Sequence, residues 1–207
     1  MSRRTWCVLF AALVVCTFGM AGFANAGEEE KSQLMLVEEV TVYPAGVEKY
    51  EAMVKEFVSI LAEHDFPYAF EVYATEEFHY IFSWPMKNFA DVDTLFESWM
   101  KLVEVWGWDK YAEMEKSVSG TYETNRHWFV RSRPGLSYGP DENQFDPSKS
   151  NYILWGFCYV KPGKEKAFEK NFKDFVTLFN AKEVPFGWST FQGDLGTELP
   201  LYKAPPI

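Results

Sequence analysis

Two stretches of the chain, LMLVEEVTVYPAGVEKYEAMVKEFVSILAEHDFPYAFEVY (residues 34–73) and YILWGFCYVKPGKEKAFEKNFKDFVTLFNAKEVPFGWSTF (residues 152–191), align without a gap at an offset of 118 residues. Each contains an apolar run, a proline, a helical pattern, a second proline and a second apolar run. The identical pairs include Val42 and Val160, Pro44 and Pro162, Glu51 and Glu169, Lys55 and Lys173, Phe57-Val58 and Phe175-Val176, and Pro67 and Pro185. Such self-similarity indicates two copies of one structural unit.

The first copy predicts the element order β-α-β-β-α-β. Strands are expected at residues 34–43, 67–75, 78–84 and 121–130, because β-branched and aromatic residues alternate there between turn residues. Apolar residues spaced by three and four predict a helix at 46–63 and a second one from Phe89 to Gly107, followed by a short helix at 109–117. Right-handed crossovers would give a four-stranded antiparallel sheet with the helices on one face.

The second copy is incomplete. The sequence predicts a strand at 152–160, a helix at 164–181, a strand at 186–192, a turn at 193–198 and a short strand at 199–202. The second helix and the fourth strand have no counterpart. Either the gene is shortened or a second chain covers the sheet, because long uncovered edges are unfavourable. We expect a homodimer, the commonest form of soluble oligomer.

The N-terminus has the pattern of a signal peptide. Arg3 and Arg4 precede an uncharged apolar run at 6–18, and Ala24-Asn25-Ala26 is a small-x-small cleavage motif. The alternative is a retained membrane anchor, but the run is shorter than the roughly 20 residues of a spanning helix. We therefore expect a signal peptide at 1–26, export to the periplasm or the medium, and no stable membrane insertion after cleavage. The remaining chain divides into a first module at 27–132, a linker rich in Pro, Gly, Ser and Asp at 133–150, and a truncated module at 151–207.

Composition narrows the class of protein. The chain has 207 residues, of which 47% are hydrophobic and 18% aromatic, so it is not intrinsically disordered. The formal charge of -10 provides no basic surface for nucleic acid, and we expect no nucleic-acid partner. Cleavage would leave Cys158 as the single cysteine, and its apolar surroundings in the sequence predict a buried, unreactive thiol.

An exported chain with tandem modules of this order resembles the dimeric α/β-barrel superfamily. The resemblance rests on element order and on the repeat, over residues 34–130 and part of 151–202. It implies an α+β fold of tandem ferredoxin-like β-α-β-β-α-β modules whose two sheets pack face to face into a barrel. The superfamily contains cofactor-free monooxygenases and stress-responsive barrel proteins. The alternative is an unrelated ferredoxin-like α+β protein.

The candidate site is read from side-chain alternation, because the sequence contains no diagnostic catalytic or metal-binding motif. Alternation groups Glu39 with Thr41, Glu71 with Tyr73, His79 with Ser83, and Glu123 with Asn125 and His127. We expect these polar sets to share the barrel-facing side, while Val40, Val42, Phe70, Val72, Tyr80 and Phe82 face the helices. Trp155, Phe157 and Tyr159 occupy the positions of Val37, Glu39 and Thr41 in the second copy and would add an aromatic wall.

Two functions follow from this site. The first is an exported protein that binds a small apolar or aromatic ligand or serves in assembly, with ligand contacts from Tyr73, Asn125, Trp155, Phe157 and Tyr159. The alternative is a cofactor-free monooxygenase-like enzyme acting on a small aromatic or lipophilic substrate. In it, His79 or His127 would be the general base, oriented by Glu39 or Glu71. No metal and no cofactor are expected. An ordinary solvated or dimer-facing sheet surface would contain the same residues.

Overall fold

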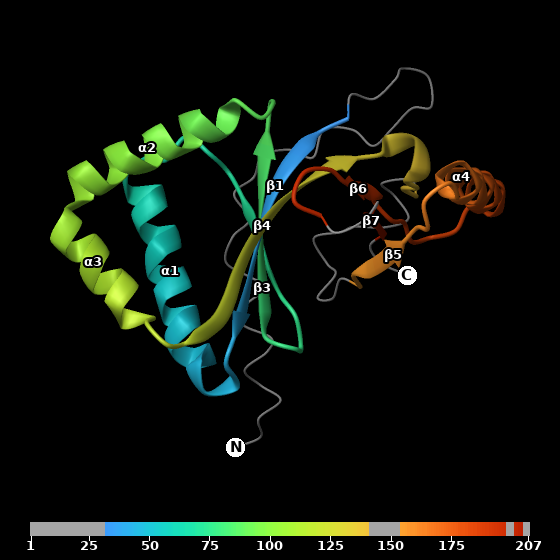
Figure 1. Cartoon of the computed structure of the whole chain (residues 1–207). Helices are drawn as coiled ribbons and strands as arrows, with labels where there is room; N and C mark the ends of the chain where they lie inside the picture. The colour runs from blue at the N-terminus through green and yellow to red at the C-terminus, as the bar shows by residue number, and fades with distance from the viewer. Residues whose placement is uncertain (1–31, 141–153, 198–200, 205–207) are drawn as a thin grey trace. The chain divides into compact units, whose positions relative to one another are not determined.

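A computed structural model of the chain describes residues 32–140, 154–197 and 201–204 (Figure 1). The chain divides into two compact units, which we describe separately. The N-terminal unit consists of Gln33–Ser132 with Gly193–Glu198, and the C-terminal unit contains Arg133–Gln192. Both combine helices with antiparallel strands, so the expected α+β class is confirmed.

The N-terminal unit has the predicted element order. Its elements are β1 (Leu34–Val42), the short 3-10 turn η3 (Pro44–Gly46), α1 (Val47–Glu63), β2 (Glu71–Ala74), β3 (His79–Met86), α2 (Asp91–Trp106), α3 (Trp108–Ser117) and β4 (Tyr122–Ser132). The strands lie in the order β2-β3-β1-β4 and every neighbouring pair is antiparallel. This is the strand order expected from the crossovers.

The helices of this unit cover one face of its sheet (Figure 1). The core between them contains Val40 and Val42 of β1, Tyr80 and Phe82 of β3, and Val54 of α1, all of them buried. Phe70, directly before β2, and Leu95 of α2 also pack against this core. The prediction that alternate apolar residues of β1 and β3 face the helices is therefore confirmed.

A second apolar cluster joins the helices to one another. Ile60 and Leu61 of α1 pack with Leu102 of α2 and Met114 of α3. The ring of Phe57 lies 5.4 Å from that of Trp99, measured between ring centroids. α1 thus packs against both α2 and α3 near its C-terminal end.

Glycines mark two sites where the backbone could not accept a side chain. Gly107 has φ 111° and ends α2, since this conformation disfavours other residues. At Gly46 a Cβ atom would lie 2.7 Å from the carbonyl oxygen of Thr121. The turn between β1 and α1 is therefore pressed against the start of β4.

The C-terminal unit is smaller. It contains η4 (Pro134–Leu136), β5 (Gly156–Tyr159), α4 (Glu165–Lys182), β6 (Phe191–Gly193) and β7 (Leu201–Ala204), and its strands lie in the order β6-β7-β5. Leu136 and Val160 are buried at its centre, and Phe168 and Phe172 of α4 pack against them. The predicted helix at 164–181 is confirmed within one residue at each end.

The strands of this unit differ from their predicted extents. The strand expected at 186–192 begins only at Phe191, because Trp188 and Thr190 bond instead to the chain following β4. The Trp188 N–H donates to the Tyr138 carbonyl at 2.7 Å, and the Arg133 N–H donates to the Thr190 carbonyl at 2.7 Å. β5 begins at Gly156, and residues 152 and 153 lie outside the described part. The strand expected at 199–202 is β7, displaced by two residues.

Candidate functional site

The register of the N-terminal sheet decides which polar residues share its helix-free face, which we define as the face opposite the helices. Thr41 lies opposite His79, and Glu39 lies between Ile81 of β3 and Arg126 of β4. In antiparallel strands directly opposed residues point to the same side. The helix-free face therefore carries Val37, Glu39, Thr41, Glu71, Tyr73, His79, Ile81, Ser83, Thr124, Arg126 and Trp128.

The face contains a hydrogen-bonded polar centre. His79 Nδ1 lies 2.7 Å from the Glu39 carboxylate and 3.4 Å from the Thr41 hydroxyl. The Thr124 hydroxyl donates to the Thr41 hydroxyl at 3.0 Å. The side chains of His79 and Glu39 are only 27% and 17% exposed. Water therefore screens the pair less than it would an exposed one.

Glu39 determines which nitrogen of His79 can meet a ligand. An ionised carboxylate only accepts hydrogen bonds, so in the neutral imidazole the proton resides on Nδ1. The Nε2 atom then carries the lone pair, and it makes no hydrogen bond to any described residue. His79 is thus oriented as an acceptor, either for a ligand hydroxyl or for a proton.

Apolar side chains lie beside the polar centre on the same strands. Val37 lies two residues before Glu39 on β1, opposite Ser83 of β3 and Trp128 of β4. Val37, Ile81 and Trp128 are all buried. The apolar side chains beside the polar centre are thus covered in the folded chain, whereas His79 remains half-exposed.

Glu71 is paired with a different residue. It accepts a hydrogen bond from the Tyr73 hydroxyl on the same strand. Burial, and then the neighbouring Glu71 carboxylate, raises the pKa of the Tyr73 hydroxyl above its ordinary value. Tyr73 therefore remains a hydrogen-bond donor at neutral pH, and Glu39 is the carboxylate that orients His79.

The prediction that Asn125 and His127 share this face is wrong, and Glu123 lies at a shift in the register between β1 and β4. His127 lies opposite Glu38 and Asn125 lies opposite Val40, on the side that faces the helices. The Asn125 side chain donates to the Glu38 carboxylate at 2.8 Å, and His127 Nε2 is 3.7 Å from the same oxygen. Alternation groups residues within one strand, but only the register between strands decides which group meets which.

The aromatic residues expected from the second copy belong to the C-terminal unit. Trp155 is half-buried just before β5, whereas Phe157 and Tyr159 on β5 are exposed. Their side chains alternate with Cys158 and Val160, which pack against α4. Cys158 is half-buried rather than buried, and desolvation raises the pKa of its thiol, which disfavours the reactive thiolate.

The sequence does not predict two polar residues of the helix-free face, Thr124 and Arg126. Thr124 and Arg126 alternate along β4 with Asn125 and His127, the residues that the sequence predicts on this face. The sequence offers no clear signal between the two rows, because Trp128 continues the row of Thr124 and Arg126 and Phe129 continues the row of Asn125 and His127.

Two surface hollows lie elsewhere. One, of about 370 Å³, is lined by His64, Phe66, Lys101 and Leu102 among others. The other, of about 350 Å³, lies between β5 and the start of α4. Among the described residues, no three His, Cys, Asp or Glu side chains are placed to hold a metal ion. No helix in this part of the chain has the length and apolarity to cross a bilayer.

Comparison with known proteins supports the fold. No protein-family model matches the chain, and no curated protein matches its sequence. Among solved structures, a crystal structure of an anthrone oxidase-like protein is similar, with a TM-score of 0.54 and 13% sequence identity. The match covers 85% of this chain and 73% of that chain. At this identity the similarity establishes a shared fold.

Proposed function

We propose that this chain is an exported small-molecule-binding protein of the dimeric α/β-barrel type. Its ligand, a small apolar or aromatic molecule with one polar group, binds the helix-free face of the N-terminal sheet with that group at His79. The observation that carries the proposal is the 2.7 Å contact between His79 and Glu39, half-buried beside a buried apolar surface. Such a pair fixes the imidazole for recognition.

Two observations support a tandem arrangement of two related modules in this chain. The strand order β6-β7-β5 of the C-terminal unit repeats the order β2-β3-β1, and α4 follows β5 as α1 follows β1. The match to the solved structure covers 85% of this chain, which is more residues than the N-terminal unit contains. Both observations are expected of two related modules.

Recognition would use the lone pair on His79 Nε2. A phenol, an enol or another weakly acidic hydroxyl would donate to this atom while Glu39 holds the opposite side of the ring. Thr41 and Thr124 extend the polar end, and the Tyr73 hydroxyl, whose proton is donated to Glu71, adds an acceptor oxygen.

A second candidate is a cofactor-free monooxygenase-like enzyme, and the same pair favours it. A histidine held by a carboxylate is suited to general-base catalysis, and the similar structure is named as anthrone oxidase-like. On an anthrone-type substrate, His79 would take a proton from the acidic methylene. Dioxygen would be the oxidant: one of its oxygen atoms becomes the new carbonyl and the other leaves as water.

One experiment tests both candidates. The purified chain is titrated with anthrone under argon, followed by tryptophan fluorescence, and oxygen uptake is then measured in air against the uncatalysed reaction. We expect saturable binding, with the dissociation constant at least 10-fold higher in His79→Ala and Glu39→Gln, and unchanged in the control His127→Ala. Oxygen uptake above the uncatalysed rate that is lost in His79→Ala would favour the monooxygenase-like enzyme over the binding protein. Absence of both binding and uptake would overturn both candidates.

Export is part of the proposal and is tested separately. The motif Ala24-Asn25-Ala26 predicts a mature chain that begins at Gly27. N-terminal sequencing of the protein from the periplasm or the medium checks this start. A chain retained in the cell with Met1 intact would contradict export.

A further inference from the structure

We propose that the C-terminal unit binds a small carboxylate with an apolar body in the hollow between β5 and the start of α4, where Lys161 and Lys164 hold the carboxylate group. The hollow lies within one unit and contains no residue of the helix-free face, so this inference does not rest on the proposed function. Three features of the described residues carry it: a turn that brings two lysines together, the engagement of the nearby carboxylates elsewhere, and an apolar lining.

A tight turn brings the two lysines together. The Lys164 N–H donates to the Lys161 carbonyl at 3.0 Å, so these residues are the first and fourth of a β-turn. Pro162 and Gly163 are its central residues, and the φ of 81° at Gly163 is typical of a type II turn. The Cα atoms at the ends of such a turn lie within about 7 Å of each other. The like charges of the two ammonium groups therefore favour an anion between them.

The carboxylates of α4 are engaged with other groups. Each acidic side chain of this helix has a partner: Glu165 accepts from the Gly163 N–H at 3.0 Å, Glu169 pairs with Arg133 at 2.7 Å, and Asp174 pairs with Lys170 at 2.7 Å. None of the residues that line the hollow is acidic. Lys161 and Lys164 therefore form no ion pair with any described residue, and both ammonium groups are available to an anionic group of a ligand.

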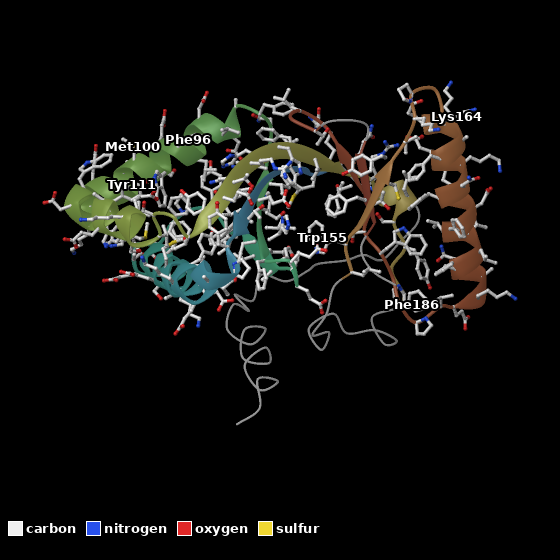
Figure 2. All side chains as sticks on the ribbon, turned by 60° about the horizontal axis from the view of Figure 1, so that its bottom comes forward. Phe96, Met100, Tyr111, Trp155, Lys164 and Phe186 are labelled. Carbon is white, nitrogen blue, oxygen red and sulfur yellow. The ribbon has the colours of Figure 1, made fainter. Side chains whose placement is uncertain are left out.

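The hollow adds an apolar surface beside the lysines. It has a volume of about 350 Å³, and half of its lining residues are apolar or weakly polar: Cys158, Val160, Ala167 and Phe168. Val160 is buried, and Phe168 packs against it from α4. Lys164 stands at the start of this helix (Figure 2), and Ala167 follows it one turn later on the same side. The volume is near the lower limit of small-molecule sites, so the ligand is small.

Comparison of the two copies shows that the lysines accompany the hollow. They occupy the positions of Tyr43 and Gly46, and the Gly46 N–H donates to the Tyr43 carbonyl at 2.7 Å, as in the second copy. In the first copy this turn is pressed against Thr121: the Tyr43 N–H donates to its carbonyl at 2.9 Å, and a Cβ atom on Gly46 would lie 2.7 Å from the same oxygen. The turn is thus common to both copies, whereas its ends are lysines only where it borders a hollow.

The two halves of the lining decide which anion fits. Inorganic phosphate would use the ammonium groups and leave the apolar half unused. A neutral aromatic compound would use the apolar half and leave the ammonium groups without a counter-charge. A carboxylate on an apolar body uses both halves. The competing explanation is a pair of lysines that only keeps the turn solvated, and it predicts no saturable binding.

Isothermal titration calorimetry of the purified chain with 1-naphthoate tests the proposal. We expect saturable binding of one molecule, at least 10-fold tighter than the binding of either the neutral analogue 1-naphthalenemethanol or inorganic phosphate. Lys161→Ala and Lys164→Ala should each raise the Kd at least 5-fold. The matched control Lys166→Ala removes an exposed lysine of α4 that does not line the hollow, and it should leave the Kd unchanged.

Two further variants separate this site from the helix-free face. Ala167→Trp should fill the hollow and abolish binding of 1-naphthoate, with circular dichroism as the check of folding, whereas His79→Ala should leave binding unchanged. Binding that His79→Ala abolishes and Ala167→Trp retains would place the ligand on the helix-free face, which overturns this inference and leaves the proposed function intact. Absence of saturable binding, or phosphate binding as tight as that of 1-naphthoate, would also overturn it.

Protection of Cys158 gives an independent measurement on the unaltered chain. Its half-buried thiol lines the hollow. Saturating 1-naphthoate should slow alkylation of Cys158 by iodoacetamide at least 5-fold, measured by mass spectrometry of the peptide that contains it, and the neutral analogue should not. An unchanged rate in the presence of bound 1-naphthoate would contradict this position of the site.

Discussion

The substitutions Phe57→Ala and Phe175→Ala make a matched pair, because the two residues stand at equivalent places on α1 and α4. Phe57 is half-buried, and its ring centroid lies 6.1 Å from that of Phe70 and 5.4 Å from that of Trp99. Phe175 is half-exposed and makes no ring contact in the described part of the chain. The same chemical change should therefore have different effects on the free energy of unfolding.

The magnitudes follow from these surroundings. Truncation of a fully buried Phe lowers the free energy of unfolding by about 3–5 kcal/mol, and each aromatic pair contributes about 0.5–1.5 kcal/mol. Since Phe57 is only half-buried, we expect a loss of about 2–3 kcal/mol. Substitution at an exposed position changes stability by about 0.5 kcal/mol, so Phe175→Ala should remain below about 1 kcal/mol in the monomer.

Urea denaturation at 1 µM, followed by far-ultraviolet circular dichroism, measures both losses. With a slope of about 2 kcal/mol per molar urea, Phe57→Ala should lower the midpoint by about 1 M and Phe175→Ala by less than about 0.5 M. Equal losses at 1 µM would show that α4 is covered within one chain, and the reasoning would fail.

Two further predictions concern stability. Gly46→Ala should lower the free energy of unfolding by about 1–3 kcal/mol, since the new methyl group would lie 2.7 Å from the Thr121 carbonyl oxygen; thermal denaturation measures it, and an unchanged melting temperature would contradict the close approach. Asp91 accepts hydrogen bonds from the Lys87 N–H and the Tyr68 hydroxyl, each at 3.0 Å, and the Lys87 N–H holds the pKa of this carboxyl below its ordinary value. Its stabilisation is present at neutral pH and disappears as pH falls through the lowered pKa. Asp91→Asn should therefore be less stable at pH 7 and lose less stability on acidification to pH 3, and parallel pH profiles for both chains would refute this.

The sequence was sufficient to predict the element order because its local signals agree. The period of the apolar residues changes from two in β1 to between three and four in α1, and Pro44 separates the two patterns. Gly107 ends α2 where the apolar spacing stops. Boundaries in the C-terminal unit were less accurate, since Trp188 and Thr190 satisfy their backbone groups with the chain after β4 rather than with β7.

The candidate site could be predicted only in part, for a reason that lies in sheet geometry. Glu39 and His79 are not directly opposed, because the register pairs Thr41 with His79 and Glu39 with Ile81. They meet across a diagonal, a separation that long side chains span readily. On β4 the register sets Arg126 rather than His127 opposite Glu39, and a shift of one residue would have reversed the choice. No local pattern in one strand contains that information.

The repeat itself explains why two related sequences give units with different surroundings. Positions that pack within each copy keep their character, as Val42 and Val160 do under α1 and α4. The pair Gly46 and Lys164 does not, because in the first copy this turn meets the start of β4, and in the second it borders an open hollow. The apolar pair Phe57 and Phe175 is unchanged, although only Phe57 is covered within the chain. The residue at the turn has therefore changed with its surroundings, whereas the apolar residue on the helix has been kept.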